Sequence, residues 1–478
     1  MEWFLGALTL LLGFYMAWNI GANDVANAMG TSVGSKALTL KKAVFLAAIL
    51  EFSGAFFVGS EVSETIQKGI VDPTVFSSEP LLFILGMMGA LLSTGILLQI
   101  ASYFGLPIST THALVGAVLG FGLVIGGAGA IFWSKLGTIV ASWILSPLLS
   151  GVISYALFGL IQKKILYALS PIEATQRLLP ILVFSCFFIV CIGLFYDGIP
   201  GFDIPLHPGA VVSLAASLGL IAFFFSHRSV QKIANPPLEI APSFHPTQAV
   251  SLEKALHHLQ RATLSNRSEP HAELFSNALD QVRGLAETVK KNTQFSHPHT
   301  QYHSVEKLFV FLQIVSACLI AFAHGANDVA NAIGPVAAVI TALKTNSLSA
   351  QTEIPSWLLA LGGGGIVIGL ATWGWRVIET IGKKITELTP TRGFSAEFGA
   401  AITILFASKL GLPISSTHAL VGAVLGVGLN RGLQALNLKM LKEIAISWIV
   451  TIPLCATMSI LCFYALKWTY SFISSYLH

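Results

Sequence analysis

Charged residues are scarce in this sequence. Asp, Glu, Lys and Arg make up 10% of its 478 residues, whereas soluble domains carry roughly 25%. A soluble protein of this length would need far more charge to cover its surface. The net charge of +4 is small and scattered through loops, which argues against nucleic-acid binding and for membrane orientation. The low charge therefore predicts a protein that is embedded in the lipid bilayer.

Cysteine motifs and catalytic motifs are also missing. The five cysteines lie in apolar segments without CxxC or Cys/His spacing, so we interpret them as small buried hydrophobic residues. The sequence contains no Walker motif, zinc motif or nucleophile elbow. Its apolar segments hold too few acidic residues for a membrane pyrophosphatase that binds several Mg²⁺ ions. We therefore expect neither enzymatic activity nor an organic cofactor.

Long apolar runs dominate what remains. Hydrophobic residues make up 54% of the chain, in runs of about 20 residues without the period-2 alternation of barrel strands. We therefore predict an all-α polytopic membrane protein. The N-terminal run has no small-residue cleavage site and is interpreted as the first span. Twelve spans can be drawn, at about 3–24, 43–60, 80–103, 106–128, 137–160, 180–197, 209–226, 308–327, 356–377, 395–410, 411–429 and 444–468.

Basic residues predict how these spans are oriented. Clusters of Lys and Arg follow spans one, five, seven, nine and eleven, and all five clusters share one side if the N-terminus lies outside. The positive-inside rule makes that side cytoplasmic. We expect a multi-pass protein of the plasma (inner) membrane with both termini outside. A first membrane half (1–226) and a second (307–478) would flank a cytoplasmic helical loop (227–306) with amphipathic spacing.

Two polar motifs are duplicated within the apolar segments. GANDVANA occurs at 21–28 and 325–332, and GLPISTTHALVG at 105–116 matches GLPISSTHALVG at 411–422. Two related multi-span units therefore flank the central loop. In the predicted topology, the first GANDVANA span runs inward and the second runs outward. The units are thus predicted to be inverted repeats with broken helices at mid-membrane, and such repeats place a substrate site at their interface.

The GANDVANA motif predicts a cation site. Its polar side chains fall within one helical turn. An uncompensated carboxylate near the bilayer centre costs several kcal/mol, so its presence there indicates a function. Gly21 and Gly30 are expected to loosen or break the helix and to free backbone carbonyls. Amide, carboxylate and carbonyl oxygens together suit Na⁺. The alternative is simple hydrogen bonding between helices, but the duplication favours cation ligands, namely Asn23, Asp24, Asn27, Asn327, Asp328 and Asn331.

The GLPIS motif predicts an anion site. Gly105 and Pro107 end one helical run, and Ser or Thr residues then begin the next. Ser and Thr are favoured N-caps, and a helix start offers N–H groups and a positive dipole end. Capping alone is the simpler explanation, but two copies favour a tetrahedral oxyanion that uses both helix starts. The predicted anion ligands are Ser109, Thr110, Thr111, Ser415, Ser416 and Thr417, together with Asp24 and Asp328.

Two further carboxylates and two histidines lie in apolar surroundings. Glu51 and Glu397 either neutralise a cation, relay a proton or pair with neighbouring donors. They are not repeat mates, since the position equivalent to Glu397 is Leu91. His112 and His418 are interpreted as structural helix residues, with proton relay as the alternative. The run Gly362–Gly365 is interpreted as a site of close helix packing.

The sequence resembles the inorganic phosphate transporter (PiT) family in the paired GANDVANA and GLPIS motifs, and the resemblance covers both membrane halves. It implies a secondary transporter that moves inorganic phosphate with Na⁺ or H⁺ by alternating access. It also implies that Asp24, Asp328 and the Ser/Thr groups act in transport, and that Glu51 and Glu397 match glutamates of family members. A sulfate or other oxyanion symporter on the same scaffold is the alternative. The sequence leaves open whether the chain forms a homo-oligomer.

Overall fold

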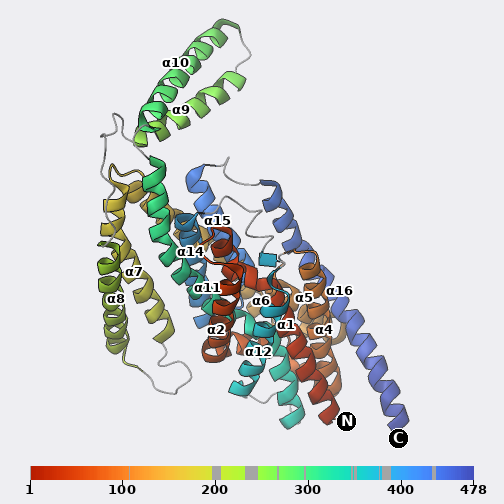
Figure 1. The fold of residues 1–478 in the computed structure, drawn as a ribbon. Coiled ribbons are helices and arrows are strands. Elements are labelled where there is room, and N and C mark those ends of the chain that lie inside the picture. The colour runs from red at the N-terminus through yellow and green to blue at the C-terminus, as the bar shows by residue number, and fades with distance from the viewer. Residues whose placement is uncertain are drawn as a thin grey trace. The chain divides into compact units, whose positions relative to one another are not determined.

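The computed structural model describes residues 2–106, 108–195, 206–231, 246–265, 269–294, 298–345, 348, 353–375, 377–378, 389–432 and 438–477 (Figure 1). The chain forms two compact units. Unit 1 comprises residues 1–158, 186–218 and 310–478, and unit 2 comprises residues 159–185 and 219–309.

The described residues are almost entirely helical. The helices are α1 (Glu2–Gly34), α2 (Leu40–Val58), α3 (Ser60–Lys68), α4 (Pro80–Tyr103), α5 (Thr110–Phe121), α6 (Trp133–Ile161), α7 (Pro171–Phe195), α8 (Pro208–Gln231), α9 (Pro246–Ser265), α10 (Glu269–Gln294), α11 (Pro298–Thr345), α12 (Ser356–Thr372), α14 (Pro390–Lys409), α15 (Ser416–Arg431) and α16 (Leu438–Leu477). Short 3-10 or π-helical turns lie at Pro73–Phe76, Gly122–Gly126, Ala128–Ala130 and Gln162–Leu166. Within the described residues, the β pairing consists of an isolated antiparallel bridge between Val71 and Ile131. The all-α prediction is confirmed.

A helix occupies each of the twelve predicted spans, but not every helix is long enough to cross a membrane. Seven described helices have the length and apolarity to do so, or eight if α2 and α3, which are bent by 63°, form one span. The helix α5 with its π-helical turn, and α12, are apolar but shorter. At 1.5 Å per residue, the 17 residues of α12 rise about 26 Å, less than the roughly 30 Å hydrocarbon core.

The two sequence repeats interlock in unit 1. α1 packs against α12 of the second repeat, where a Cβ on Gly21 would overlap the Ile366 carbonyl oxygen. α11 packs in the same way on α2 of the first repeat, where a Cβ on Gly325 would overlap the Glu51 carbonyl oxygen. Only glycine permits these backbone approaches, since any side chain would collide with the neighbouring helix. Each GANDVANA helix therefore makes an equivalent contact with a helix of the other repeat.

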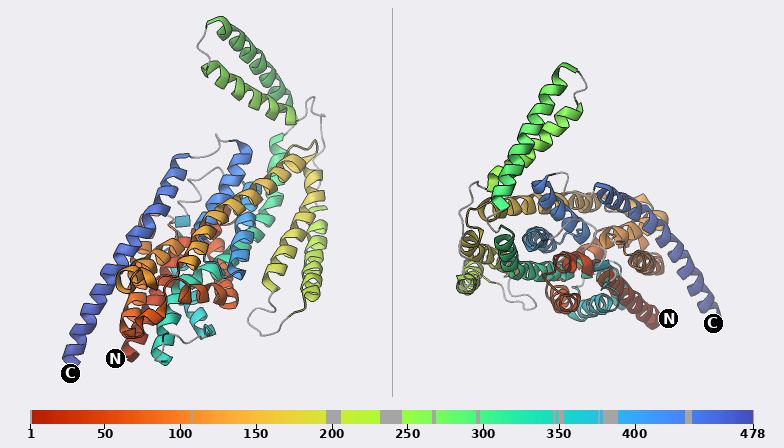
Figure 2. Two further views of the ribbon diagram at one scale, coloured as in Figure 1. Left: turned by 180° about the vertical axis from the view of Figure 1, so that it is seen from behind. Right: turned by 45° about the horizontal axis from the view of Figure 1, so that its top comes forward.

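The helices that follow the GLPIS motifs also pack against helices of the other repeat. Gly116 of α5 faces the Ile452 backbone of α16, and Gly422 of α15 faces the Pro147 backbone of α6. The serine Ser150 of α6 adds a hydrogen bond of 2.6 Å to the Ala419 carbonyl oxygen. α4 and α5 lie beside α16 (Figures 1 and 2). Helices of each repeat therefore pack closely on helices of the other one.

α1 and α11 run antiparallel to each other. Gly6 lies nearest to Leu343, and Gly13 lies nearest to Val336, so the residue numbers rise along one helix as they fall along the other. Figure 1 places the start of α1 and the end of α16 at the same end of unit 1. The glycine run of α12 also makes close contacts, with Gly362 against Ile333 and Gly365 against Ala17. The prediction of close helix packing at this run is confirmed.

Unit 2 contains the helices of the central polar segment. α9 and α10 pack against each other as a helical hairpin. In the same unit, Gln176 of α7 donates a hydrogen bond of 3.3 Å to the Val230 carbonyl oxygen at the end of α8.

One expectation from the sequence is wrong. The GANDVANA segments neither loosen nor break their helices, because α1 continues for 33 residues and α11 for 48 residues through the motif. Gly21 and Gly325 serve close packing between helices instead, and the helix also continues through Pro335. The interruptions lie at the GLPIS motifs, between α4 and α5 and between α14 and α15. The backbone carbonyls of GANDVANA are therefore not freed as ligands.

Candidate functional site

The two GLPIS motifs form matching helix–turn–helix hairpins. Gly105 and Gly411 adopt left-handed φ values of 65° and 64°, which favour glycine. The following amide N–H groups close the ends of α4 and α14: Leu106 donates to the Ala101 carbonyl and Leu412 to the Ala407 carbonyl, both at 2.9 Å. These are the bonds of a Schellman motif, which ends a helix and turns the chain back.

Each hairpin begins its second helix with a serine cap. The hydroxyl oxygen of Ser109 accepts from the His112 N–H and that of Ser415 from the His418 N–H, both at 3.2 Å. The predicted N-caps are thereby confirmed. The two helix starts also meet, because the equivalent rings of His112 and His418 have centroids 4.2 Å apart. Two positive dipole ends therefore lie close together inside unit 1.

The motif asparagines connect α1 and α11 to these hairpins. The Nδ2 atom of Asn23 donates to the Ser102 hydroxyl at 3.1 Å and to the Leu106 carbonyl at 3.2 Å. Asn327 makes the equivalent bonds to Ser408 and to the Leu412 carbonyl at the same distances. The repeat is thus preserved down to single hydrogen bonds, and Asn23 and Asn327 fix the hairpins as the alternative interpretation expected.

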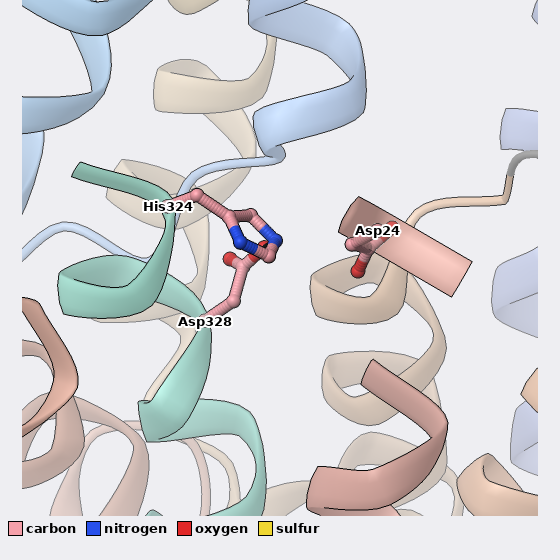
Figure 3. A group of neighbouring side chains, drawn as sticks. All are labelled: Asp24, His324 and Asp328. Carbon is pink, nitrogen blue, oxygen red and sulfur yellow. Dashed lines mark ion pairs between the residues drawn. The ribbon is translucent and has the colours of Figure 1, made fainter. Parts of the chain in front are cut away.

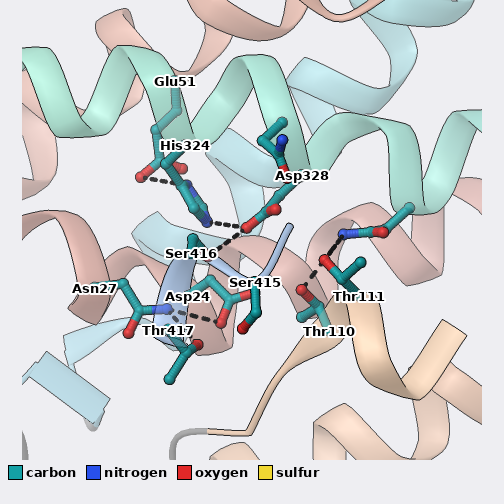
Figure 4. A network of polar contacts seen from close by, with 12 residues as sticks. Asp24, Asn27, Glu51, Thr110, Thr111, His324, Asp328, Ser415, Ser416 and Thr417 are labelled. Carbon is teal, nitrogen blue, oxygen red and sulfur yellow. Dashed lines mark hydrogen bonds and ion pairs between the residues drawn. The ribbon is translucent and has the colours of Figure 1, made fainter. Parts of the chain in front are cut away.

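The second asparagine of each motif reaches the hairpin of the other repeat. Asn27 donates to the Thr417 hydroxyl at 2.8 Å, and Asn331 donates to the Thr110 and Thr111 hydroxyls at 3.4 and 3.3 Å (Figure 4). Thr111 in turn donates to the Ile414 carbonyl at 2.9 Å. The predicted cation and anion groups therefore belong to one continuous polar network.

Two carboxylates and an imidazole lie at the centre of this network. Single ligand atoms of Asp24, His324 and Asp328 lie within 4.8 Å of one another, and all three side chains are buried (Figure 3). Oδ2 of Asp328 accepts from the Ser416 hydroxyl at 2.8 Å and lies 2.8 Å from His324 Nε2. His324 Nδ1 lies 3.3 Å from an oxygen of Glu51 on α2. Carboxylates from both repeats thus share one buried site.

The site offers oxygen acceptors that have no donors. Among the described residues, no hydrogen bond reaches Oδ2 of Asp24, Oδ1 of Asp328 or the four motif amide oxygens, Oδ1 of Asn23, Asn27, Asn327 and Asn331. Burial of a polar oxygen without a partner costs up to a few kcal/mol. Hard cations such as Na⁺ bind carboxylate and amide oxygens of this kind. The residues present therefore fit a cation beside the two helix starts.

Comparison with known proteins identifies the family. The model of the phosphate transporter family matches residues 20–459. This chain belongs to the phosphate transporter family. A putative phosphate permease of Chlamydia trachomatis is 44% identical over 469 residues, covering 97% of this chain and 99% of its own length. A chloroplastic inorganic phosphate transporter 2-1 of Arabidopsis thaliana is 44% identical over 457 residues, covering 95% of this chain and 70% of its own length.

A solved structure agrees with this assignment. A chain described as the sodium-dependent phosphate transporter superposes with a TM-score of 0.78 at 35% sequence identity. The match covers 97% of the present chain and 99% of that structure. This member of the phosphate transporter family is therefore a multi-span helical membrane protein whose fold is that of a transporter.

Glu397 takes its hydrogen bonds from a separate set of donors. Its carboxylate accepts from Ser32 at 2.7 Å, from Gln313 at 3.3 Å, from Ser316 at 2.5 Å and from Thr31. These donors come from α1 and α11 and all are neutral. A buried carboxylate surrounded by neutral oxygen-bearing groups suits a cation, while the hydrogen bonds also satisfy the alternative of pairing with neighbouring donors.

All fourteen residues predicted from the sequence are buried. Each exposes 2% or less of its surface. The GANDVANA groups, the GLPIS groups and Glu51 converge on the central network, whereas Glu397 lies in its own donor cage. This convergence supports the predicted ligands.

Sequence reasoning missed one residue of the central site. His324 directly precedes the second GANDVANA, and its imidazole lies between two carboxylates. A usable signal was present, because the equivalent position before the first GANDVANA is Ile20. A polar residue at i−4 from Asp328 places both side chains on one face of α11.

Proposed function

We propose that this chain is a secondary transporter that moves inorganic phosphate across the membrane together with Na⁺. The observation that carries the proposal is the meeting of the two capped helix starts beside two carboxylates and donor-free amide oxygens. The solved relative described as sodium-dependent supports Na⁺ as the coupling ion. H⁺ is the other candidate for this role.

Phosphate would bind at the starts of α5 and α15. Hydroxyl groups of Ser109, Thr110, Thr111, Ser415, Ser416 and Thr417 lie there with the first N–H groups of both helices. These groups favour an anion because the N-terminal helix dipoles point toward it. No Lys or Arg of the described chain pairs with the central carboxylates. Neutral donors and co-bound cations would therefore balance the phosphate charge.

Na⁺ would bind beside the phosphate, at the oxygens of Asn23, Asp24, Asn27, Asn327, Asp328 and Asn331. Each Na⁺ offsets one negative charge of the anion and of the buried carboxylates. Binding of either ion thereby lowers the cost of burying the other, which is the physical basis of coupling. Glu51 and Glu397 are assigned to the cation side of this arrangement.

We further propose that the two repeats are inverted and that the site opens by alternating access. The antiparallel course of α1 and α11 and the equivalent hydrogen bonds of both repeats support this arrangement. The burial of every predicted ligand supports a closed conformation, from which the repeats must move to admit ions from either side. The predicted location is the plasma membrane, with both termini outside and the central loop in the cytoplasm.

Uptake of radiolabelled phosphate into proteoliposomes tests this function. The Na⁺ gradient and the pH gradient are imposed separately, with empty liposomes as the control. Concentrative uptake driven by Na⁺ alone supports the proposal, and uptake driven only by the pH gradient assigns H⁺ instead. Absence of gradient-driven uptake in both arms would refute a symport function.

A second oxyanion is the remaining alternative. Neutral donors and helix dipoles can hold sulfate as well as phosphate, because both are tetrahedral anions. Excess unlabelled sulfate is therefore added to the same uptake assay. Unchanged phosphate uptake supports phosphate specificity, whereas strong competition would assign the chain as a broader oxyanion transporter.

A further inference from the structure

The two halves of the central site are alike in their backbone contacts but differ at two buried positions. Gly21 packs against the Ile366 carbonyl, and Gly325 packs against the Glu51 carbonyl, so Ile366 and Glu51 occupy equivalent places. The residues just before these glycines are Ile20 and His324. Two isoleucines in one half therefore correspond to a glutamate and a histidine in the other. All four side chains are fully buried.

The polar pair immobilises Asp328. His324 lies one helical turn before Asp328 on α11, and its Nε2 is 2.8 Å from Asp328 Oδ2. The Ser416 hydroxyl donates to the same oxygen at 2.8 Å. The other ring nitrogen of His324 lies 3.3 Å from Glu51 (Figure 4). One carboxylate oxygen of Asp328 thus has two polar contacts, and the imidazole that provides one of them is anchored on α2.

Asp24 has no comparable partner. The residue one turn before it is Ile20, which offers only hydrocarbon. Oδ1 of Asp24 accepts a hydrogen bond of 3.2 Å from Asn27, and Oδ2 accepts none from the described residues. A ligand atom of His324 lies within 4.8 Å of Asp24, but the ring nitrogens lie closer to Asp328 and Glu51, at 2.8 and 3.3 Å. A buried carboxylate without a close ion pair has a large unfavourable desolvation energy, which a bound cation can offset. A cation that used both oxygens of Asp328 would have to displace the imidazole from Oδ2, whereas no imidazole lies as close to Asp24.

We propose that His324 makes the two aspartates unequal: it holds Asp328 as a fixed part of the anion site and leaves Asp24 as the main carboxylate ligand of the coupling cation. This inference rests on the proposed Na⁺-coupled phosphate function. His324 is a positioning residue in this account, since it acts through Asp328 and Glu51. The duplicated motif thereby has one cation-binding copy and one copy that orients the anion.

The test is equilibrium binding of radiolabelled phosphate to the purified full-length protein in detergent, titrated with Na⁺ at saturating phosphate. We expect Asp24→Asn to raise the half-saturating Na⁺ concentration about tenfold or more. Asp328→Asn is expected to weaken phosphate binding while changing the Na⁺ requirement less than about threefold. Equal Na⁺ shifts in the two variants, or a larger shift in Asp328→Asn, would overturn the inference.

A second comparison tests His324 itself. His324→Ile copies the residue of the other half and frees Asp328. In this background, Asp328→Asn is expected to shift the Na⁺ requirement about as much as Asp24→Asn does, and a purely structural histidine would not produce that change. Ile20→Val is the matched control and is expected to leave the Na⁺ requirement unaltered. If Asp328→Asn still leaves the Na⁺ requirement unaltered in the His324→Ile protein, the positioning role is wrong.

The two sets of measurements separate the inference from the function on which it rests. Wild-type protein that binds phosphate independently of Na⁺ would refute Na⁺ coupling before any variant is compared. Wild-type protein that requires Na⁺ leaves the function intact, and the two aspartate variants then decide the inference. This decision requires no change at His324, so it holds even if His324→Ile does not fold.

Discussion

The side chain of Asn27 in α1 donates a hydrogen bond of 2.8 Å to the hydroxyl of Thr417 at the start of α15. This bond joins the GANDVANA motif of one repeat to the GLPIS motif of the other. It leaves the Thr417 hydroxyl hydrogen available as a donor, because the oxygen acts as the acceptor. Asn331 reaches Thr111 in the equivalent way at 3.3 Å. Cation and anion groups are therefore linked across the repeats through single side chains.

Removal of the Thr417 hydroxyl should weaken phosphate binding. Thr417→Val keeps the shape but removes one of the two acceptors of the Asn27 amide and one donor to the anion, at a cost of about 1–3 kcal/mol. We expect the KM for phosphate uptake to rise about tenfold. Thr417→Ser, which keeps the hydroxyl, is expected to remain near the wild-type KM. Similar KM values for the valine and serine variants would show that the hydroxyl takes no part in binding.

Neutralisation of either central aspartate should abolish transport without unfolding the protein. Asp24→Asn and Asp328→Asn each remove a buried charge that the ions require, and we expect phosphate uptake to fall about a hundredfold. Glu79→Gln is the matched control, since Glu79 is exposed at the start of α4. Gel filtration and thermal melting confirm the fold. Normal uptake by both aspartate variants would contradict the assignment of these carboxylates.

The carboxylate of Glu397 should affect the Na⁺ requirement. Glu397→Gln removes the charge and places an amide donor among the hydroxyl groups of Thr31, Ser32 and Ser316. If the cage holds a cation, the Na⁺ concentration for half-maximal uptake rises about tenfold. The measurement is phosphate uptake at graded Na⁺, with Glu79→Gln as control. A lower melting temperature with an unchanged Na⁺ requirement would instead assign Glu397 to structural pairing.

The glycines of GANDVANA should be essential for packing. A Cβ at Gly21 or Gly325 would overlap a backbone carbonyl of the partner helix. Such overpacking costs about 1–3 kcal/mol or more. We expect Gly21→Ala and Gly325→Ala to lower the thermal melting temperature and the yield of folded protein.

Gly364→Ala provides the control for this prediction. Gly364 lies in α12, where an added Cβ meets nothing within 4 Å. The melting temperature of the Gly364→Ala protein should therefore match that of the wild type. Melting of the Gly21→Ala and Gly325→Ala proteins at the wild-type temperature would show that the helices separate readily at these contacts.

The sequence predicted the local features of the site well. Ser109 and Ser415 cap helices as expected, because the capping pattern depends only on neighbouring residues. The shared face of Asn23, Asp24 and Asn27 follows in the same way from helical periodicity. The family resemblance to phosphate transporters is confirmed by the family model.

Features that depend on a partner helix could not be predicted. Gly21 was expected to loosen α1, but it contacts Ile366, which lies more than 300 residues away in the chain. The imidazole of His324 gains its significance from Glu51 on α2, and no local pattern reveals that contact. The comparison of His324 with Ile20 within the repeat offers the best sequence signal for such a residue.

The central claim is that phosphate binds where the starts of α5 and α15 meet. A structure of the protein in phosphate and Na⁺, under conditions where uptake is measured, tests it most directly. We expect density for a tetrahedral anion in contact with the hydroxyl groups of both helix starts, with cation density beside Asp24. An anion bound elsewhere, or empty helix starts at saturating phosphate, would show that phosphate does not bind where α5 and α15 begin.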